Sequence, residues 1–169
     1  DALYCSTRCR VAEHRLRRRK ERDVSIEGIG YEGQTVEALI SKLRIRGVET
    51  LVDVRLNAIS RKRGFSKRAL AAALAESGIA YVHLPVLGNQ RDNRAGYGEL
   101  DSPLAREVRA RFTAELEAEA ARNALEELAK LARTGPVAVF CYEADEQHCH
   151  REQVLEQVRG ILDRELVTR

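Results

Sequence analysis

Residues 24–56, VSIEGIGYEGQTVEALISKLRIRGVETLVDVRL, decide the fold because two apolar segments flank an amphipathic one. The first segment predicts a strand that ends in glycines, and the last predicts a buried strand. Thr35 is suited to cap a helix between them, and Gly47 to end it. Within that helix, apolar residues recur at the i, i+3, i+4, i+7 spacing: Val36, Leu39, Ile40 and Leu43. A strand, a helix and a second strand require a crossover connection, which indicates parallel strands.

The same alternation continues to the end of the chain. Continuous apolar runs predict two further strands, and periodic segments predict further helices, of which the longest breaks once near 117–123. We therefore predict an α/β fold: a three-layer α/β/α domain over residues 24–169, Rossmann-like, with a mostly parallel sheet of about four strands. The loop 88–103 is longer than ordinary connections and so is expected to be functional. The further strands are predicted at 79–87 and 135–143, and the helices at 66–78, 104–133 and 149–166.

Composition limits the class of protein. The chain has 169 residues, of which 44% are hydrophobic and 33% charged, as in a soluble domain with a core of its own. No apolar run approaches the roughly 20 residues that span a membrane. The chain has four cysteines but no dense disulfide framework, which favours a reducing compartment. We expect a cytoplasmic protein with no membrane contact, and the sequence does not define its oligomeric state.

The N-terminal tail, residues 1–23, differs from the rest of the chain. It carries eight Lys/Arg and four Asp/Glu, a local charge of +4. Cys5 and Cys9 are spaced C-x3-C and His14 follows, a pattern that resembles half of a zinc-ribbon or treble-clef knuckle. Zinc needs four ligands in a closed site. The tail is therefore a frayed basic helix, a zinc site completed by an upstream segment or a second chain, or an oxidised cysteine pair.

Chemistry is expected where the strands end. In an open parallel sheet, ligands bind beyond the carboxyl ends of the strands. We predict one polar rim there, with Cys141, Glu143, His83 and Asp53 as catalytic residues. Six Lys/Arg against one Asp in residues 53–73 favour a phosphate-bearing ligand, such as nucleic acid or a nucleotide. The residues predicted to bind this ligand are Arg55, Arg61, Cys149, His150 and Arg151.

Three ordered motifs resemble the domain-of-unknown-function family 488 over about residues 25–165. They are a strand-end DVR with a basic segment and an aromatic residue, a Y-x-H-x-P-x-L-G strand, and C-x-E-x5-C-H-R. One departure is GYEGQ at 30–34, where many members have a GHS type of sequence. The resemblance implies a fold and a site rather than a reaction. The matching positions are Asp53, Arg55, Arg61, Phe65, Tyr81, His83, Pro85, Leu87, Gly88, Cys141, Glu143, Cys149, His150 and Arg151.

The stretch CYEADEQHCHR, residues 141–151, permits four interpretations. Cys141 could be a nucleophile activated by a histidine, with Glu143 orienting the base. A metal could bind Cys141, His148, Cys149 and His150. The helix start at His150 and Arg151 could bind an anion, or Cys141 and Cys149 could form a disulfide.

The function predicted from the sequence is that of a small α/β enzyme with one rim site for a phosphate-bearing ligand. Two alternatives stay open. One is an adaptor that binds nucleic acid without catalysis. The other is a metal-dependent hydrolase or a thiol-based enzyme. No cofactor is predicted with certainty, and zinc at the N-terminal knuckle is the one that the sequence suggests.

Overall fold

A computed structural model describes residues 25–167 of the chain. The predicted alternation of strands and helices is confirmed, including the break in the long helical segment. The predicted tail and its knuckle residues, Cys5 and Cys9, lie outside the described residues. The elements in chain order are β1 (Ile26–Gly30), α2 (Val36–Ile45), β2 (Thr50–Asp53), α3 (Lys67–Glu76), β3 (Ala80–His83), α4 (Pro103–Leu116), α5 (Glu119–Thr134), β4 (Val137–Cys141) and α6 (Arg151–Val167).

The four strands form one parallel sheet in the order β1-β4-β2-β3. The last strand is thus inserted between the first two and pairs with both of them. The register aligns Gly30 of β1 with Cys141 of β4, and Asp53 of β2 with His83 of β3. Because all the strands are parallel, these residues end at the same edge of the sheet, as predicted.

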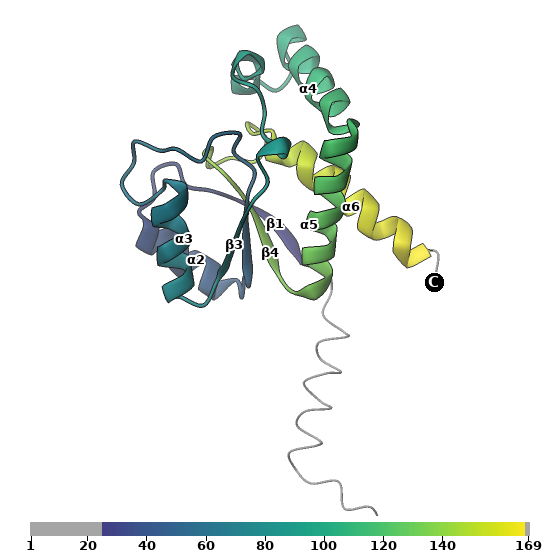
Figure 1. The fold of residues 1–169 in the computed structure, drawn as a ribbon. Coiled ribbons are helices and arrows are strands. Elements are labelled where there is room, and N and C mark those ends of the chain that lie inside the picture. Colours follow the sequence, from purple (N-terminus) through teal and green to yellow (C-terminus); the bar gives the residue numbers. More distant parts are fainter. Residues whose placement is uncertain (1–24, 168–169) are drawn as a thin grey trace, which may run out of the picture.

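Helices cover both faces of the sheet, which makes the predicted three layers (Figure 1). Helices α2 and α3 pack on one face, where Leu39 and Leu74 are fully buried in the same apolar cluster. Helices α5 and α6 pack on the other face, where Leu128 and Val158 are fully buried. Among residues 25–167, no helix is long and apolar enough to cross a lipid bilayer.

The end of β4 is a point at which the chain changes faces. The connections that leave β1 and β2 run to α2 and α3, whereas the connection that leaves β4 runs to α6 on the opposite face. Diverging connections leave a crevice at the edge of the sheet, and in open α/β folds this is where ligands bind. The topology therefore places a crevice beside Cys141.

The predicted long loop forms a wall above this edge. It contains short 3-10 turns at Arg91–Asn93 and Ala95–Gly98. A further 3-10 turn, Pro85–Leu87, precedes it, because the strand predicted over residues 79–87 ends at His83. Asn93 ties the loop together, since its amide donates to Asn89 and to the backbone oxygen of Val108 in α4. Tyr97 anchors the other end, since its hydroxyl donates to Gln153 of α6. These buried hydrogen bonds fix the loop over the crevice.

Candidate functional site

A pocket of about 350 Å³ opens at the end of β4. Its wall comes from the ends of the strands, from the long loop and from the segment that precedes α6. The side chains of Cys141, Glu143, Cys149 and His150 gather in it, and we call these four residues the thiol cluster. The other residues that line the pocket are Tyr31, Arg55, Asn57, Ile59, Asn89, Arg94, Tyr97, Tyr142 and His148.

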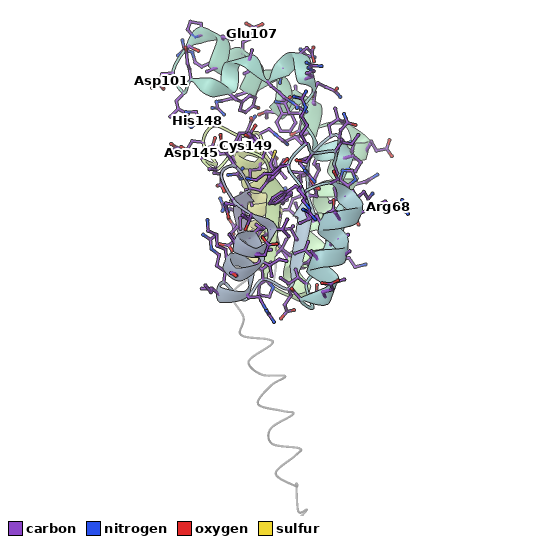
Figure 2. The ribbon with its side chains drawn as sticks, turned by 90° about the vertical axis from the view of Figure 1, so that its left-hand side faces the viewer. Arg68, Asp101, Glu107, Asp145, His148 and Cys149 are labelled. Carbon is purple, nitrogen blue, oxygen red and sulfur yellow. The ribbon has the colours of Figure 1, made fainter. Side chains whose placement is uncertain are left out.

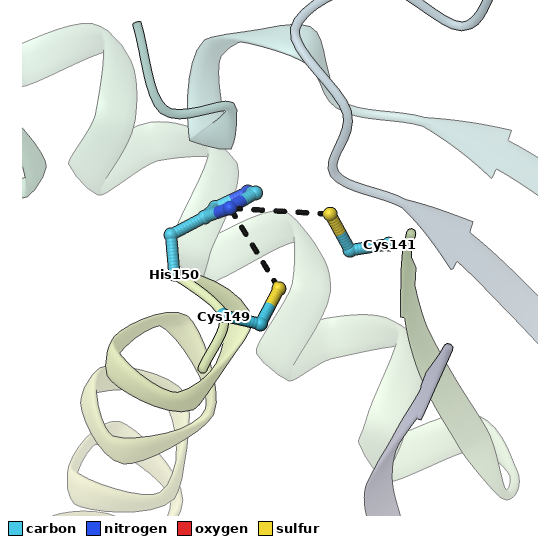
Figure 3. Close-up of side chains that lie close together, drawn as sticks. All are labelled: Cys141, Cys149 and His150. Carbon is cyan, nitrogen blue, oxygen red and sulfur yellow. Dashed lines mark hydrogen bonds between the residues drawn. The ribbon is translucent and has the colours of Figure 1, made fainter. Parts of the chain in front are cut away.

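The two cysteines and the imidazole of the thiol cluster are almost fully buried. Cys141, Cys149 and His150 are 5%, 1% and 7% exposed, and both cysteines are free thiols. The Nδ1 atom of His150 lies 3.9 Å from Sγ of Cys141 and 3.8 Å from Sγ of Cys149 (Figure 3). One nitrogen atom therefore faces two sulfur atoms.

The tautomer of His150 follows from its other contact. Its Nε2 atom lies 3.2 Å from the backbone oxygen of Val54, which can only accept a hydrogen bond. Nε2 therefore carries the proton in the neutral ring, and Nδ1 presents a lone pair to the two sulfur atoms. The ring of Phe112 packs edge-on against the imidazole with its centroid 5.3 Å away, which holds this orientation.

The carboxylate of Glu143 completes the cluster. Sγ of Cys141 donates to its Oε2 atom over 3.3 Å. Burial opposes the charge of Glu143, but hydrogen bonds from Cys149, from its own backbone amide and from Cys141 outweigh burial and lower its pKa. Burial, and then the neighbouring Cys141, raise the pKa of the Cys149 thiol well above its usual value. The side chains thus combine an ionised carboxylate with a protonated thiol.

The backbone that carries Glu143 is held from both sides. Arg151 is buried and donates to the backbone oxygens of Glu143 and Ala144 over 2.6 and 3.1 Å. Gly30 lies on the opposite side, where a Cβ would overlap the backbone oxygen of Glu143. The glycine that ends β1 therefore lets this segment cross the end of the strand, and Arg151 fixes it there.

A second polar cluster lies at the end of β2. The guanidinium of Arg55 pairs with the carboxylate of Asp53 at 2.6 Å and also donates to the hydroxyl of Tyr31. The backbone oxygen of Phe65 accepts a further hydrogen bond from Arg55. Tyr81 donates to the same carboxylate over 2.6 Å. We call Arg55, Asp53, Tyr31 and Tyr81 the arginine cluster.

The electrostatics of the arginine cluster keep it charged. Burial alone would lower the pKa of Arg55, but the hydrogen bonds and the negative charge of Asp53 raise it above its usual value. Burial and the hydrogen bond to Asp53 raise the pKa of Tyr81. Since Asp53 is fully buried and Arg55 is 6% exposed, this ion pair is largely shielded from solvent.

Residues 35–158 match the protein family described as "Domain of unknown function DUF488". The chain belongs to the DUF488 family. The DUF488 match includes all four residues of the thiol cluster. It also includes β2, β3 and β4, whereas β1 precedes it. No curated protein and no solved structure matches the chain.

The structure of this DUF488 chain brings together five of the residues predicted for the rim. Cys141, Glu143, Cys149 and His150 share the pocket, and Arg55 reaches its wall. Each belongs to the motifs on which the family resemblance rests.

Three other predicted residues do not line the pocket. His83 hydrogen-bonds the backbone oxygen of Arg55 and lies near Lys67. Asp53 is enclosed in the arginine cluster, and Arg151 holds the backbone from beneath. These three residues therefore lie beside the pocket and outside its lining.

Arg61 is exposed on the basic segment beside the pocket. The neighbouring Asn57 and Ile59 line the mouth, and Ser60 hydrogen-bonds Tyr31. His148, which the sequence offered as a metal ligand, pairs with Asp145 at 3.1 Å. The segment that carries Arg61 therefore forms one edge of the mouth.

Sequence reasoning missed the contribution of the long loop to the pocket. Asn89, Arg94 and Tyr97 line the wall, and Arg94 donates to the backbone oxygen of Asn89. The available signal was a long connection rich in Asn and Gly, which predicted a functional loop. Of its pocket-lining residues only Tyr97 was a candidate from the sequence, as an aromatic side chain near the rim.

Proposed function

We propose that this DUF488 chain is an enzyme that converts a small polar ligand in the pocket at the end of β4. Glu143 accepts and returns a proton in this reaction. The observation that carries the proposal is the thiol cluster itself, in which carboxylate, imidazole and sulfur groups meet in one pocket. Side chains of these types transfer protons and activate nucleophiles when they lie within hydrogen-bond reach.

The arrangement favours Glu143 over Cys141 as the reacting group. A reactive thiolate needs an electropositive surrounding, since positive charge stabilises the ionised sulfur. Here the carboxylate of Glu143 lies 3.3 Å from Sγ of Cys141, and the second thiol faces the same imidazole. A carboxylate so placed disfavours a bare thiolate but is well suited to take a proton from water or from substrate.

The proposed substrate class is a small ligand that carries phosphate. The support is the basic segment at residues 57–63, which borders the mouth through Asn57 and Ile59 and carries Arg61, Lys62 and Arg63. Lys62 is anchored there, since its Nζ donates to the backbone oxygen of Tyr31. Tyr142 and Ile59 add exposed apolar surface at the mouth, suited to the nonpolar part of such a ligand.

The test is a turnover screen of the full chain. The probes are p-nitrophenyl phosphate, bis-p-nitrophenyl phosphate, p-nitrophenyl acetate, adenosine and cytidine monophosphates. We expect a phosphate-bearing probe to be turned over and Glu143→Gln to reduce kcat by about 100-fold or more, the usual contribution of a positioned acid–base group. Glu126→Gln, an exposed glutamate of α5, is the matched control and should keep full activity. No turnover of any probe, or full turnover by Glu143→Gln, would contradict the proposal.

A second candidate function is supported by one observation. Arg68, on α3, lies on the far side of the molecule from His148 and Asp145, which are close to Cys149 (Figure 2). The exposed basic residues Arg61, Arg63, Lys67 and Arg68 therefore form a run that begins beside the mouth of the pocket and continues onto α3, as a surface that contacts a nucleic-acid backbone would. Binding of DNA and RNA that falls steeply between two salt concentrations supports this adaptor function, and no binding at the lower salt concentration rules it out.

A further inference from the structure

The thiol cluster has the donor set of a transition-metal site. One ligand atom each from Cys141, Cys149 and His150 lies within 4.8 Å of the other two, and all three residues are buried. Two ligands at a tetrahedral angle on zinc are separated by about 3.6 Å, given the usual zinc–sulfur and zinc–nitrogen distances. The observed 3.9 and 3.8 Å between Nδ1 and the two sulfur atoms need only a few tenths of an ångström of contraction around an ion.

The contact that orients a metal-binding histidine is also already formed. Histidine ligands of metals usually donate their other ring N–H to a carbonyl or a carboxylate, which orients the ring. Nε2 of His150 lies 3.2 Å from the backbone oxygen of Val54 and so leaves Nδ1 free as the ligand atom. The ring is thus held in the tautomer and the direction that a metal would require.

Glu143 adjoins the three ligand atoms. Sγ of Cys141 donates to its Oε2 atom over 3.3 Å, and Glu143 lines the same pocket. Two guanidinium groups in this region are held by other partners: Arg55 pairs with Asp53, and Arg151 donates to the backbone oxygens of Glu143 and Ala144. A cation between the sulfur atoms would therefore lie beside an acceptor carboxylate.

We infer that Cys141, Cys149 and His150 bind one divalent transition-metal ion, of which zinc suits the two sulfur ligands and one nitrogen ligand best. The inference takes the pocket of the proposed function as its site. Binding forms two metal–sulfur bonds and one metal–nitrogen bond, and both thiol protons pass to solvent. Thiolate and imidazole ligands select zinc over magnesium and calcium, which prefer oxygen ligands.

The fourth position of the ion would face the pocket. Three protein ligands with one open position are typical of catalytic zinc, whereas structural zinc has four protein ligands. Glu143 falls outside the set of three ligands but lines the same pocket. A water molecule on the ion would lose its proton to Glu143 and become a hydroxide nucleophile. The ion and the carboxylate then have separate tasks, one to activate water and the other to accept its proton.

The experiment uses the full chain with Cys5→Ser and Cys9→Ser, so that the N-terminal cysteines cannot contribute. Titration with Co²⁺ should give one ion per chain, with a thiolate-to-cobalt charge-transfer band and the visible bands of tetrahedral cobalt, and Zn²⁺ should displace it. His150→Ala and Cys149→Ser should weaken binding by more than about 100-fold, since loss even of a group that only orients a ligand costs about 10–100-fold. His83→Ala is the matched control and should bind as the parent chain does.

A second measurement avoids substitutions in the buried cluster. Alkylation of Cys141 and Cys149, followed by mass spectrometry, should slow at least tenfold when zinc is present. Binding without the charge-transfer band, or alkylation unaffected by zinc, would overturn the metal site. If the chain binds the metal but turns over no probe, the proposed enzyme function is refuted and the metal site stands. If the chain keeps full turnover after the metal is removed by a chelator, the role of the metal in catalysis is refuted and the enzyme function stands.

Discussion

The arginine cluster and the thiol cluster lie at the ends of neighbouring strands, yet their contacts differ in kind. Around Arg55 the charges and hydrogen-bonding groups have close partners, at 2.6 to 3.2 Å. Around His150 the sulfur contacts are 3.8 and 3.9 Å long, and within residues 25–167 the carboxylate of Glu143 forms no ion pair with a Lys or Arg side chain. The first cluster is complete within the chain, whereas the second lacks a partner that a ligand or an ion would supply.

The sharpest way to test this difference is to remove Arg55. Arg55→Ala leaves the Asp53 carboxylate buried without its cation, and breaking a buried pair in this way costs about 3–5 kcal/mol. We expect that loss in the free energy of unfolding, measured by urea denaturation. Arg46→Ala, which removes the exposed pair with Glu27, is the control and should cost less than about 1 kcal/mol. Equal costs for the two variants would show that the arginine cluster does not support the fold.

Zinc should stabilise the thiol cluster and leave the arginine cluster unaffected. At a free zinc concentration about 100 times Kd, binding to the folded state adds about 2.7 kcal/mol to the free energy of unfolding. We expect this gain in stability in the Cys5→Ser/Cys9→Ser chain. We expect no gain when Cys149→Ser is added to that chain. Thermal unfolding with and without zinc measures the effect. The same gain in both chains would place the metal elsewhere.

Gly30 lies at the sheet edge against the backbone of Glu143, and its substitution should have an intermediate effect. Gly30→Ala puts a Cβ against the backbone oxygen of Glu143, and overpacking of this kind costs about 1–3 kcal/mol. We expect lower stability together with weaker cobalt binding, because the segment that holds Glu143 must move. Gly98→Ala, where a Cβ meets nothing within 4 Å, is the control. Unchanged cobalt binding in Gly30→Ala would show that the segment moves without disturbing the site.

His83 should give the smallest effect of the residues predicted to be catalytic. It lies at the end of the edge strand β3, outside the pocket, with Arg55 and Lys67 as partners. We expect His83→Ala to change kcat/KM by less than about 2-fold, since a residue that does not touch substrate adds little to acid–base catalysis. Steady-state kinetics on the best probe from the turnover screen measures it. A loss similar to that of Glu143→Gln would return His83 to the active site.

The sequence predicted the layers, the parallel strands and the edge at which the site forms. These features follow from local patterns, namely apolar periodicity and the order of strands and helices. The insertion of β4 between β1 and β2 could not be predicted, because pairing of distant strands leaves no local pattern. The pocket depends on that insertion, since it brings Cys141 between the ends of β1 and β2.

The roles of single residues were harder to predict than their location. Arg55 was predicted to bind a ligand, and in the structure it lines the pocket while its guanidinium pairs with Asp53. The sequence contained the two residues of this pair, two positions apart in DVR, but did not indicate that they pair with each other. Arg151 gave no comparable signal, because its partners are backbone oxygens whose positions only the folded segment defines.

The central claim is that the thiol cluster binds a metal through two sulfur atoms and one nitrogen atom. X-ray absorption spectroscopy of the zinc-loaded Cys5→Ser/Cys9→Ser chain tests it most directly. The account predicts two sulfur ligands at about 2.3 Å and one imidazole nitrogen at about 2.0–2.1 Å, with the remaining position taken by oxygen. A shell of oxygen and nitrogen alone, with no sulfur, would contradict it.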